Sequence, residues 1–213
     1  MFLETRAVAP FFKNGFLLGC EKTREAIVID PGDEAAELIG LIDLARLKVR
    51  RILLTHAHMD HVSGVARLKA ATGALVALHQ DDLFLYESAV QQGLLFGYTV
   101  DPPPKPDFFF EPGVPLGFGE YEVHVHHTPG HSPGGVCLQV GPAGAVGRDL
   151  FVGDTLFAGS IGRTDLPGGN YDVLMASIRG VLFGFGDEAV VYPGHGPKTT
   201  IGDERRTNPF LQD

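Results

Sequence analysis

The stretch Thr55-His56-Ala57-His58-Met59-Asp60-His61 determines the fold that we predict for this chain. It directly follows a short apolar run that is typical of a buried strand. Four side chains that can bind a metal, His56, His58, Asp60 and His61, therefore fall within six residues at the end of one strand. A solvated polar loop is the alternative, but histidines rarely cluster at this spacing by chance. We interpret the stretch as a metal-binding loop.

The spacing within this loop favours two adjacent metal sites. His56 and His58 are separated by one residue, so in an extended loop both imidazoles point to the same side. Asp60 and His61 come one step later and face a neighbouring position. Neutral imidazole is the commonest metal ligand in proteins. One loop can therefore offer two ligands to each of two metals. Asp60 also fits a helix cap, since acceptors are favoured where a helix starts.

Three further segments each place one residue of ligand type beside glycine at the end of a short apolar run. These segments are Thr128–Gly135 with His131, Phe151–Phe157 with Asp154, and Tyr192–Pro197 with His195. Each is a weak signal alone, because Pro-Gly is an ordinary turn sequence. Together with the first loop they supply five histidines and two aspartates, which is enough for a dinuclear centre.

The order His-x-His-x-Asp-His, then His, Asp and His, resembles the metallo-β-lactamase superfamily. Within it, Gly153–Phe157 and Pro193–Gly196 resemble the glyoxalase II-like hydrolases, the hydroxyacylglutathione hydrolases. Ser160–Gly169 and Glu204–Phe210 resemble a short, single-domain subgroup of that branch. The ligand motifs are highly specific for the superfamily and much less specific for the substrate.

The resemblance implies a complete ligand set for two divalent metal ions. His56, His58 and His131 would hold the first metal, Asp60, His61 and His195 the second, and Asp154 would bridge both, with a water or hydroxide on the other side. Imidazole and carboxylate without thiolate suit zinc, iron or manganese. We expect zinc, with iron or manganese as alternatives.

The resemblance also implies the reaction. We expect a metal-dependent hydrolase that cleaves an acyl bond, a thioester such as S-lactoylglutathione or another hydroxyacylglutathione, with Asp60 and Asp154 as catalytic ligands. Gly162–Asp165 stands where glyoxalase II enzymes have another segment, and it resembles persulfide dioxygenases, which use one iron. That oxidoreductase is the first alternative. A non-catalytic metal-binding module is the second.

Two more residues are candidates for roles near the metals. Asp30 ends an apolar strand, and metal-bound imidazoles usually donate their second N–H to an acceptor, so Asp30 is a candidate partner. An Asx turn explains it equally well. Arg163 could bind an anionic group of the substrate. A pair with Asp165 that shapes the loop is the alternative. The other four histidines, His79, His124, His126 and His127, are interpreted as structural.

The apolar pattern predicts mixed helices and strands, and the resemblance organises them into an α/β (α+β) fold, an αββα sandwich of two packed mixed sheets with helices outside. Asn14-Gly15 predicts a tight hairpin turn. Residues 101–106, rich in proline, predict an extended connector. The predicted helices span 33–47, 62–71, 81–95 and 171–182, the last with Asn170 as its N-cap. The predicted strands span 25–29, 52–54, 75–78, 108–110, 120–128, 135–140, 149–152 and 189–192.

Composition sets the remaining expectations. The chain has 213 residues, 44% hydrophobic and 20% charged, which predicts one globular domain over 1–213. Too few residues follow His195 for a separate C-terminal glutathione-binding helical domain. The net charge of −9 disfavours nucleic acid as a partner. Two cysteines exclude a disulfide framework. No targeting or membrane-spanning segment is visible, so we expect a cytoplasmic enzyme that acts on a small molecule.

Overall fold

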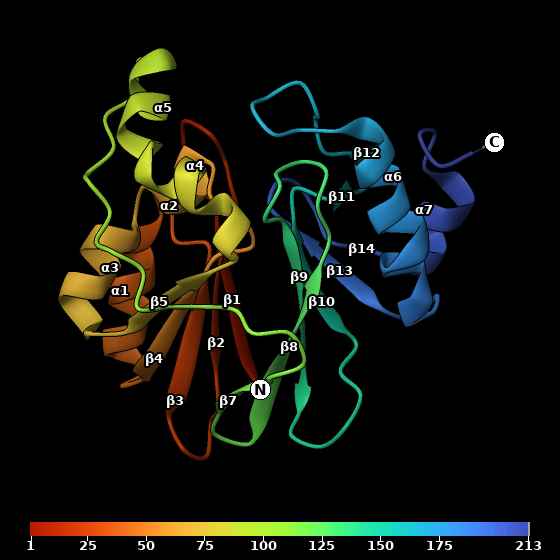
Figure 1. Ribbon diagram of the computed structural model, residues 1–213. Coiled ribbons are helices and arrows are strands. Elements are labelled where there is room, and N and C mark those ends of the chain that lie inside the picture. The colour runs from red at the N-terminus through yellow and green to blue at the C-terminus, as the bar shows by residue number, and fades with distance from the viewer. Residues whose placement is uncertain (213) are drawn as a thin grey trace.

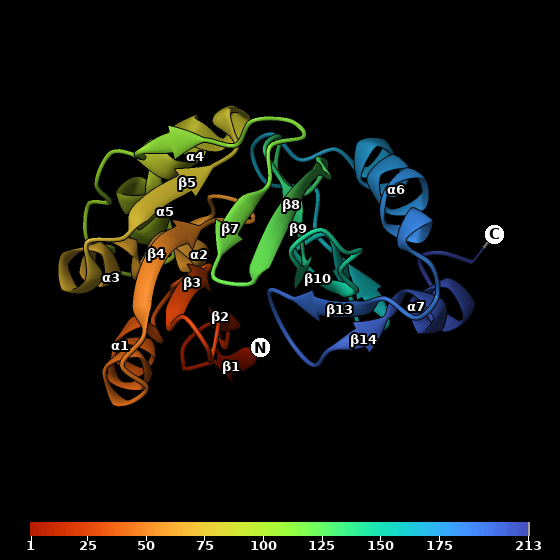
Figure 2. The same cartoon turned by 90° about the horizontal axis from the view of Figure 1, so that it is seen from below.

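The computed structural model describes residues 1–212 and shows two six-stranded mixed sheets packed face to face, with helices on their outer faces (Figure 1). This arrangement confirms the predicted αββα sandwich. Seen from below, the strands of both sheets lie between two outer layers of helices, one formed by the first half of the chain and the other by the second half (Figure 2). Within the described residues, no helix is long and apolar enough to cross a membrane.

The first sheet has the order β1-β2-β3-β4-β5-β6, antiparallel from β1 to β3 and parallel from there on. Its strands are β1 Phe2–Arg6, β2 Gly15–Gly19, β3 Glu25–Ile29, β4 Lys48–Leu53, β5 Leu75–Leu78 and β6 Phe108–Phe109. Helices α1 (Ala35–Leu44) and α3 (Val65–Thr72) are the crossover connections of its parallel strands. Strand β2 along its whole length and the later residues of β3 and β4 are apolar and buried, because both faces of the sheet are covered there.

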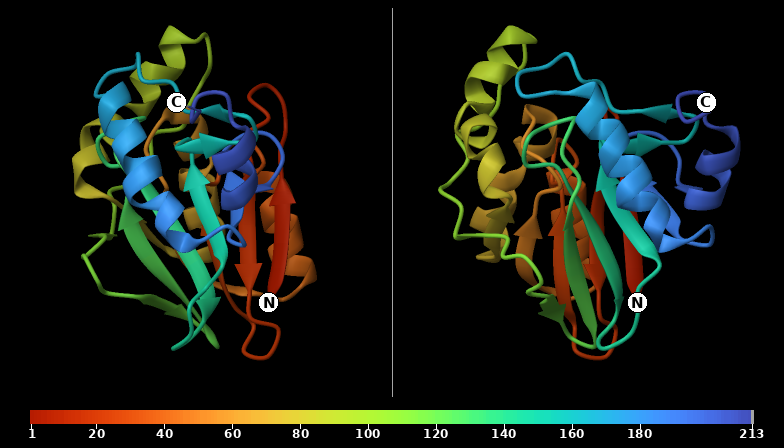
Figure 3. Two further views of the ribbon diagram at one scale, coloured as in Figure 1. Left: turned by 90° about the vertical axis from the view of Figure 1, so that its right-hand side faces the viewer. Right: turned by 45° about the vertical axis from the view of Figure 1, so that its right-hand side comes forward.

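The second sheet has the order β14-β13-β10-β9-β8-β7, with only the β10–β13 pair parallel. Its strands are β7 Leu116–Phe118, β8 Tyr121–His127, β9 Val136–Pro142, β10 Asp149–Gly153, β13 Val190–Pro193 and β14 Thr199–Thr200. Helices α6 (Tyr171–Gly180) and α7 (Ile201–Thr207) cover its outer face, in blue (Figure 3). The Asn170 side chain accepts from the Val173 N–H, which confirms the predicted N-cap of α6.

Shorter elements gather around the upper end of the sandwich in Figure 1. They are α2 Met59–Val62, the 3₁₀ turn η1 Gln80–Asp82, α4 Leu83–Glu87, α5 Ala89–Leu95, β11 Leu156–Phe157 and β12 Ser160–Ile161, while a second 3₁₀ turn, η2 Leu182–Phe185, follows α6. The predicted helix 81–95 is therefore three pieces, with a break at Ser88, where ψ is 8°. Residues 101–106 belong to neither a helix nor a strand.

Helix 62–71 was predicted to be continuous, but it is divided between α2 and α3 near Gly64. The Gly64 N–H donates to the Pro31 carbonyl, and a Cβ on Gly64 would lie 2.2 Å from the Gly32 carbonyl oxygen. The chain before α1 thus passes directly against this point. Close backbone approach, which local helix propensity does not report, sets the division.

The predicted hairpin turn at Asn14-Gly15 is wrong. Strands β1 and β2 do pair antiparallel, but residues 7–14 connect them. The Asn14 side-chain amide donates instead to the carbonyls of Pro193 (3.0 Å) and Gly196 (2.8 Å), on the loop that carries His195. Turn propensity describes only local backbone preferences, and here a distant pair of acceptors determines the position of the amide.

Aromatic side chains join the two sheets across the middle of the molecule. Phe16 of β2 packs edge-to-face on Phe151 of β10, with ring centroids 4.9 Å apart, and on Tyr192 of β13, at 6.1 Å. Phe151 and Tyr192 stack on each other at 4.8 Å. Such contacts add to the hydrophobic gain of burying the rings. This trio fixes the first sheet against the strands that lead to Asp154 and His195.

Removing one ring of this trio should be costly. Phe16→Ala should lower the free energy of unfolding by about 3–5 kcal/mol, because it leaves a cavity between the sheets. Urea unfolding followed by circular dichroism measures this loss. Val146→Ala, at a side chain that is 87% exposed, is the control and should change the free energy by less than about 0.5 kcal/mol. A similar small change in Phe16→Ala would contradict the role of the trio.

Candidate metal centre

Four loops meet at the upper end of the sandwich, each after a strand of one of the two sheets. Strand β4 leads into the loop with His56 and His58 and then into α2, which carries Asp60 and His61. The β8–β9 loop carries His131, and Asp154 and His195 follow β10 and β13. Helix α2, helix α5 and the loop between β12 and α6 lie around this end in two views (Figures 1 and 3).

The structure brings together all seven side chains that the sequence motifs proposed. Their ligand-type atoms form overlapping groups, and within each group the atoms lie within 4.8 Å of one another. The first group is His56, His58 and His131, the second is Asp60, His61 and His195, and a third joins Asp154 to His56 and His61. In the first group, His58 Nδ1 lies 2.9 Å from His131 Nε2. In the second, His195 Nε2 lies 3.2 Å from Asp60 Oδ2.

Asp154 lies between the two groups. Its Oδ1 is 3.5 Å from His61 Nε2, and its Oδ2 is 3.6 Å from His131 Nε2 and 3.6 Å from His195 Nε2. One carboxylate is thus in reach of both groups at once. Asp60, which also fitted a helix cap, makes no capping bond; its carboxylate faces His61 and His195.

The buried nitrogens of this cluster lack hydrogen-bond partners. Among residues 1–212, the buried side-chain atoms with no partner are His56 Nε2, His58 Nε2, His61 Nε2 and Asp154 Oδ1. All four belong to the cluster. A buried polar atom without a partner costs about 1–3 kcal/mol, and native proteins avoid this cost unless a bound group uses the atom. Imidazole nitrogens and carboxylate oxygens fit divalent metal ions as that group.

The outer nitrogens of three histidines are held by hydrogen bonds, so the inner nitrogens face the cluster. His61 Nδ1 donates to Asp30 Oδ2 (3.0 Å), and His131 Nδ1 donates to the Arg163 carbonyl (2.8 Å). His56 Nδ1 donates to the Thr55 hydroxyl (3.2 Å). That hydroxyl and the Thr55 N–H both donate to Asp30, at 2.5 and 2.7 Å. Acceptors of this kind fix the tautomer and the ring orientation of metal ligands.

Asp30 takes this place through an unusual backbone. Its φ is +49°, a left-handed conformation that aspartate adopts more readily than most residues. The carboxylate is completely buried and accepts from Thr55 and His61 together. The structure therefore places Asp30 against the histidine cluster, where the sequence had left an Asx turn as an equal alternative.

Burial and charge prepare the cluster for cations. Burial and the neighbouring histidines lower the pKa of His56 well below its usual value, and burial lowers that of His58 to about 3, so both are neutral. Burial opposes charge on His61, but the carboxylates of Asp60, Asp30 and Asp154 raise its pKa to about 10. A metal that binds His61 therefore displaces a proton.

Sequence analysis missed a second buried carboxylate, Asp82. Its Oδ2 accepts from the Ala57 N–H (3.0 Å) and the Ser132 hydroxyl (2.8 Å), and its Oδ1 accepts from the Gly134 N–H (2.6 Å). Burial raises the pKa of this carboxyl, while these donors lower it. Asp82 thus ties the loop of His56 and His58 to the loop of His131. The only signal in the sequence was its place after a predicted strand.

Arg163 lies at the pocket edge but is paired within its own loop. Its guanidinium makes two bonds of 2.7 Å to the Asp165 carboxylate, and both side chains are mostly exposed. The structure thus shows the internal pair that the sequence offered as the alternative. The Arg163 carbonyl also orients His131, so this loop supports the cluster through its backbone.

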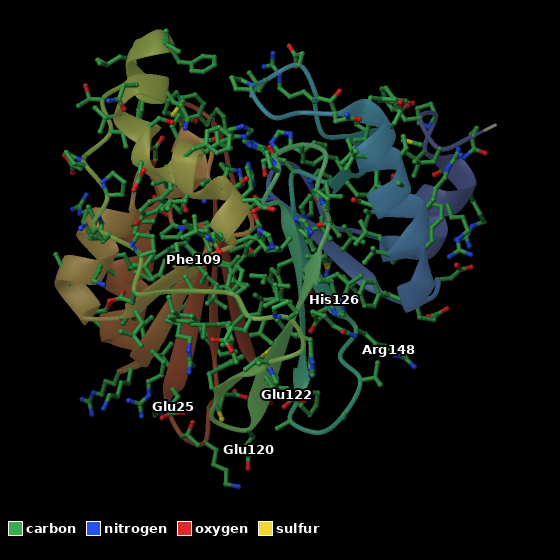
Figure 4. All side chains as sticks on the ribbon, in the orientation of Figure 1. Glu25, Phe109, Glu120, Glu122, His126 and Arg148 are labelled. Carbon is green, nitrogen blue, oxygen red and sulfur yellow. The ribbon has the colours of Figure 1, made fainter. Side chains whose placement is uncertain are left out.

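The other four histidines have partners outside the cluster. His79 and His127 stack on each other at 4.2 Å, and His126 bonds Gln139. His124 bonds Glu122, which lies near Glu25 and Glu120 at the opposite end of the molecule from α5 (Figure 4). None of these contacts involves a side chain of the cluster.

A cavity of about 210 Å³ opens above the cluster. Five of the seven side chains line this cavity, namely His58, Asp60, His131, Asp154 and His195. The other lining residues are Phe11, Met59, Gln92, Phe96, Arg163 and Leu166. A small molecule can therefore reach the carboxylates and the outer imidazoles, while His56 and His61 remain beneath them.

Several known proteins are similar to this chain in sequence and in fold. Residues 8–195 match the model of the metallo-beta-lactamase superfamily. Hydroxyacylglutathione hydrolase GloC of Haemophilus influenzae is 38% identical over 213 residues, covering 99% of this chain and 98% of that one. The B3 metallo-beta-lactamase BLEG-1 superposes with a TM-score of 0.89 at 35% identity, over all of both chains. TTHA1623, solved in a di-iron-bound form, gives 0.87 at 42% identity, over 98% of this chain and 100% of that one.

The contacts of Asp82 lead to a test. Asp82→Asn should weaken metal binding about tenfold or more, because outer residues that orient ligand loops typically contribute 10–100-fold. It should also lower the free energy of unfolding by about 2 kcal/mol, because the hydrogen bonds to a charged carboxylate are replaced by weaker bonds to a neutral amide. Competition with a chromophoric chelator measures the first quantity and urea unfolding the second.

Asp81→Asn, next to Asp82 but with a side chain that is 58% exposed, is the matched control and should change neither quantity. If Asp82→Asn retains metal as tightly as this control, Asp82 does not hold the two loops in place.

Proposed function

This chain belongs to the metallo-β-lactamase superfamily, and on that premise we propose that it is a metal-dependent hydrolase of acyl thioesters. The observation that carries the proposal is a cluster of buried side-chain nitrogens and oxygens that lack hydrogen-bond partners and lie next to an open cavity. A site that only stored or transported a metal would not require such an opening. The similarity to a hydroxyacylglutathione hydrolase over nearly the whole chain supports the thioester, with S-lactoylglutathione or another hydroxyacylglutathione as the candidate substrate.

We propose two divalent metals with distinct ligand sets. His56, His58 and His131 would hold the first, Asp60, His61 and His195 the second, and Asp154 would contact both. Such a pair, when bound, supplies an activated water and stabilises negative charge on the substrate carbonyl. Zinc suits these ligands, and the di-iron form of a similar protein makes iron the main alternative.

The chain's own residues would orient the reactants. Asp60 and Asp154 line the cavity floor, and their carboxylates can accept hydrogen bonds from an attacking water. Asp30 and the Arg163 carbonyl keep the inner histidine nitrogens in place. Among residues 1–212, the cavity lining offers no carboxylic acid beyond Asp60 and Asp154. A thioester fits this lining, because a thiol with a pKa of about 8.5 can leave as thiolate without a strong acid.

Removing one member of each kind of ligand tests the proposal. His58→Ala and Asp154→Ala should each lower the metal content per chain and reduce kcat/KM for S-lactoylglutathione by about 100-fold or more, exceeding the 10–100-fold that outer residues contribute. Metal analysis of the purified chain and a thiol-release assay measure both effects.

His124→Ala is the control, since this exposed histidine bonds only Glu122; it should keep full metal content and activity. Full metal content in both ligand variants would refute the ligand assignment. One iron per chain in the wild-type protein, with oxygen consumed on glutathione persulfide and no thioester hydrolysis, would favour the dioxygenase instead.

The pairing of Arg163 with Asp165 predicts how substrate charge affects the rate. Arg163→Ala should reduce kcat/KM for a glutathione thioester and for a neutral thioester by similar factors, because its guanidinium is already paired. Asp165→Ala should release the guanidinium and raise the preference for the anionic glutathione thioester by about two- to fivefold, the usual range for one exposed charge pair. A selective loss of the glutathione substrate in Arg163→Ala would show instead that Arg163 binds its charge.

A further inference from the structure

The walls of the cavity differ in character from its floor. The floor holds the histidines and aspartates of the cluster, whereas the walls are formed by Phe11, Met59, Phe96 and Leu166. These four side chains come from three separate parts of the chain: the segment before β2, the α2–α5 region, and the loop between β12 and α6. These apolar side chains, together with Gln92 and Arg163, surround the cavity above the cluster.

The polar groups in the walls already have partners. Gln92 accepts from the Met59 N–H (3.2 Å) and donates to the Leu85 carbonyl (2.7 Å). The Arg163 guanidinium is paired with Asp165. What the walls leave unpaired is therefore apolar surface, which favours a ligand with an apolar chain.

Phe96 is held at the mouth of the cavity by the end of α5. Its N–H donates to the Gly93 carbonyl (3.0 Å), and the Tyr98 N–H donates to the same carbonyl (2.8 Å). Gly97 follows with a φ of +70°, which reverses the chain. A Cβ on Gly93 would lie 2.7 Å from the Tyr98 carbonyl oxygen, so glycine allows this close return. The Phe96 side chain is 59% exposed, so part of its ring faces solvent at the edge of the cavity.

Phe11 forms a preformed wall opposite the charged floor. Its ring packs edge-to-face on Tyr98 with centroids 5.2 Å apart, and the Tyr98 hydroxyl donates to Asp33. Asp33 also accepts from the Ser63 hydroxyl (3.0 Å), directly after α2. This chain of contacts links the apolar wall to the helix that carries Asp60 and His61, so a ligand need not order the wall on binding.

We propose that these walls bind an aliphatic chain of the substrate, so that the enzyme prefers thioesters with longer apolar chains to the short, polar lactoyl ester. The inference rests on the proposed thioester hydrolysis and specifies its substrate class. A thioester carbonyl placed over the cluster must extend both its acyl chain and its thiol chain through this cavity. Either chain would cover Phe96 and the neighbouring apolar surface.

The preference should follow chain length. Each methylene buried against apolar walls contributes about 0.8 kcal/mol, or roughly three- to fourfold in kcat/KM. The gain should stop once the chain has passed Phe96 and reached solvent. Phe96→Ala should reduce the gain over the whole series by about tenfold, because much of the aromatic surface is removed. Phe96→Leu should retain most of it.

Two substrate series test the inference. The first keeps glutathione as the thiol and extends the acyl group from acetyl through butanoyl to hexanoyl. The second keeps acetyl and extends a neutral alkyl thiol over the same lengths. Each is measured on the metal-loaded wild-type chain, on Phe96→Ala and Phe96→Leu, and on Leu95→Ala as the control. Leu95 adjoins Phe96 but is 84% exposed and does not line the cavity.

The expected result is a rise in kcat/KM with length in one series, which identifies the chain that lies against Phe96. This rise should be lost in Phe96→Ala, largely kept in Phe96→Leu and unchanged in Leu95→Ala. Hydrolysis of all thioesters without any dependence on length, or a length dependence that Phe96→Ala leaves intact, would overturn the inference and leave the proposed function standing. No hydrolysis of any member by metal-loaded wild-type enzyme would instead refute the proposed function.

Discussion

Buried imidazole nitrogens without partners are the constraint on which this structure depends. His56, His58 and His61 each keep one ring nitrogen out of water and out of any hydrogen bond within the chain. Folding gains nothing from this arrangement alone, because desolvated polar atoms oppose it. The two-sheet core must therefore be stable enough to hold them, and a bound cation returns the lost interactions. The apolar strands that end in these loops, and the aromatic trio between the sheets, are what make such a cluster tolerable.

Two buried carboxylates, Asp30 and Asp82, hold the loops of the cluster in place from different sides. Asp30 organises the first loop from the side of β3, through Thr55 and His61. Asp82 joins that loop to the His131 loop from the side of α4. Each carboxylate is buried and accepts several hydrogen bonds from the loops that it holds. The histidines of the cluster are thus held from outside by these acceptors, and their geometry depends on them.

The sequence was most informative where chemistry is concentrated in short motifs. The loop around His56 and the strand-end residues His131, Asp154 and His195 identified the superfamily and located the cluster, because ligand spacing depends on local backbone. It failed where a residue acts through distant partners. Asp82 resembles an ordinary helix-start residue, yet its partners Ser132 and Gly134 lie 50 and 52 positions away. Asn14 resembled a turn residue, and its partners are likewise distant in the sequence. Phe11 and Phe96 carried no signal of lining a cavity, since the sequence of an apolar residue does not indicate which surface it will form.

The two hydrogen bonds that the Asn14 side-chain amide donates have a consequence for how the protein is made. Its partners Pro193 and Gly196 are 179 and 182 positions further along, so the earliest part of the chain is joined to the last of the ligand loops. During synthesis, the ribosome releases these two regions many seconds apart. Residues up to Gly196 must therefore emerge before the seven side chains of the cluster can come together. A cation would meet the complete cluster only after that point.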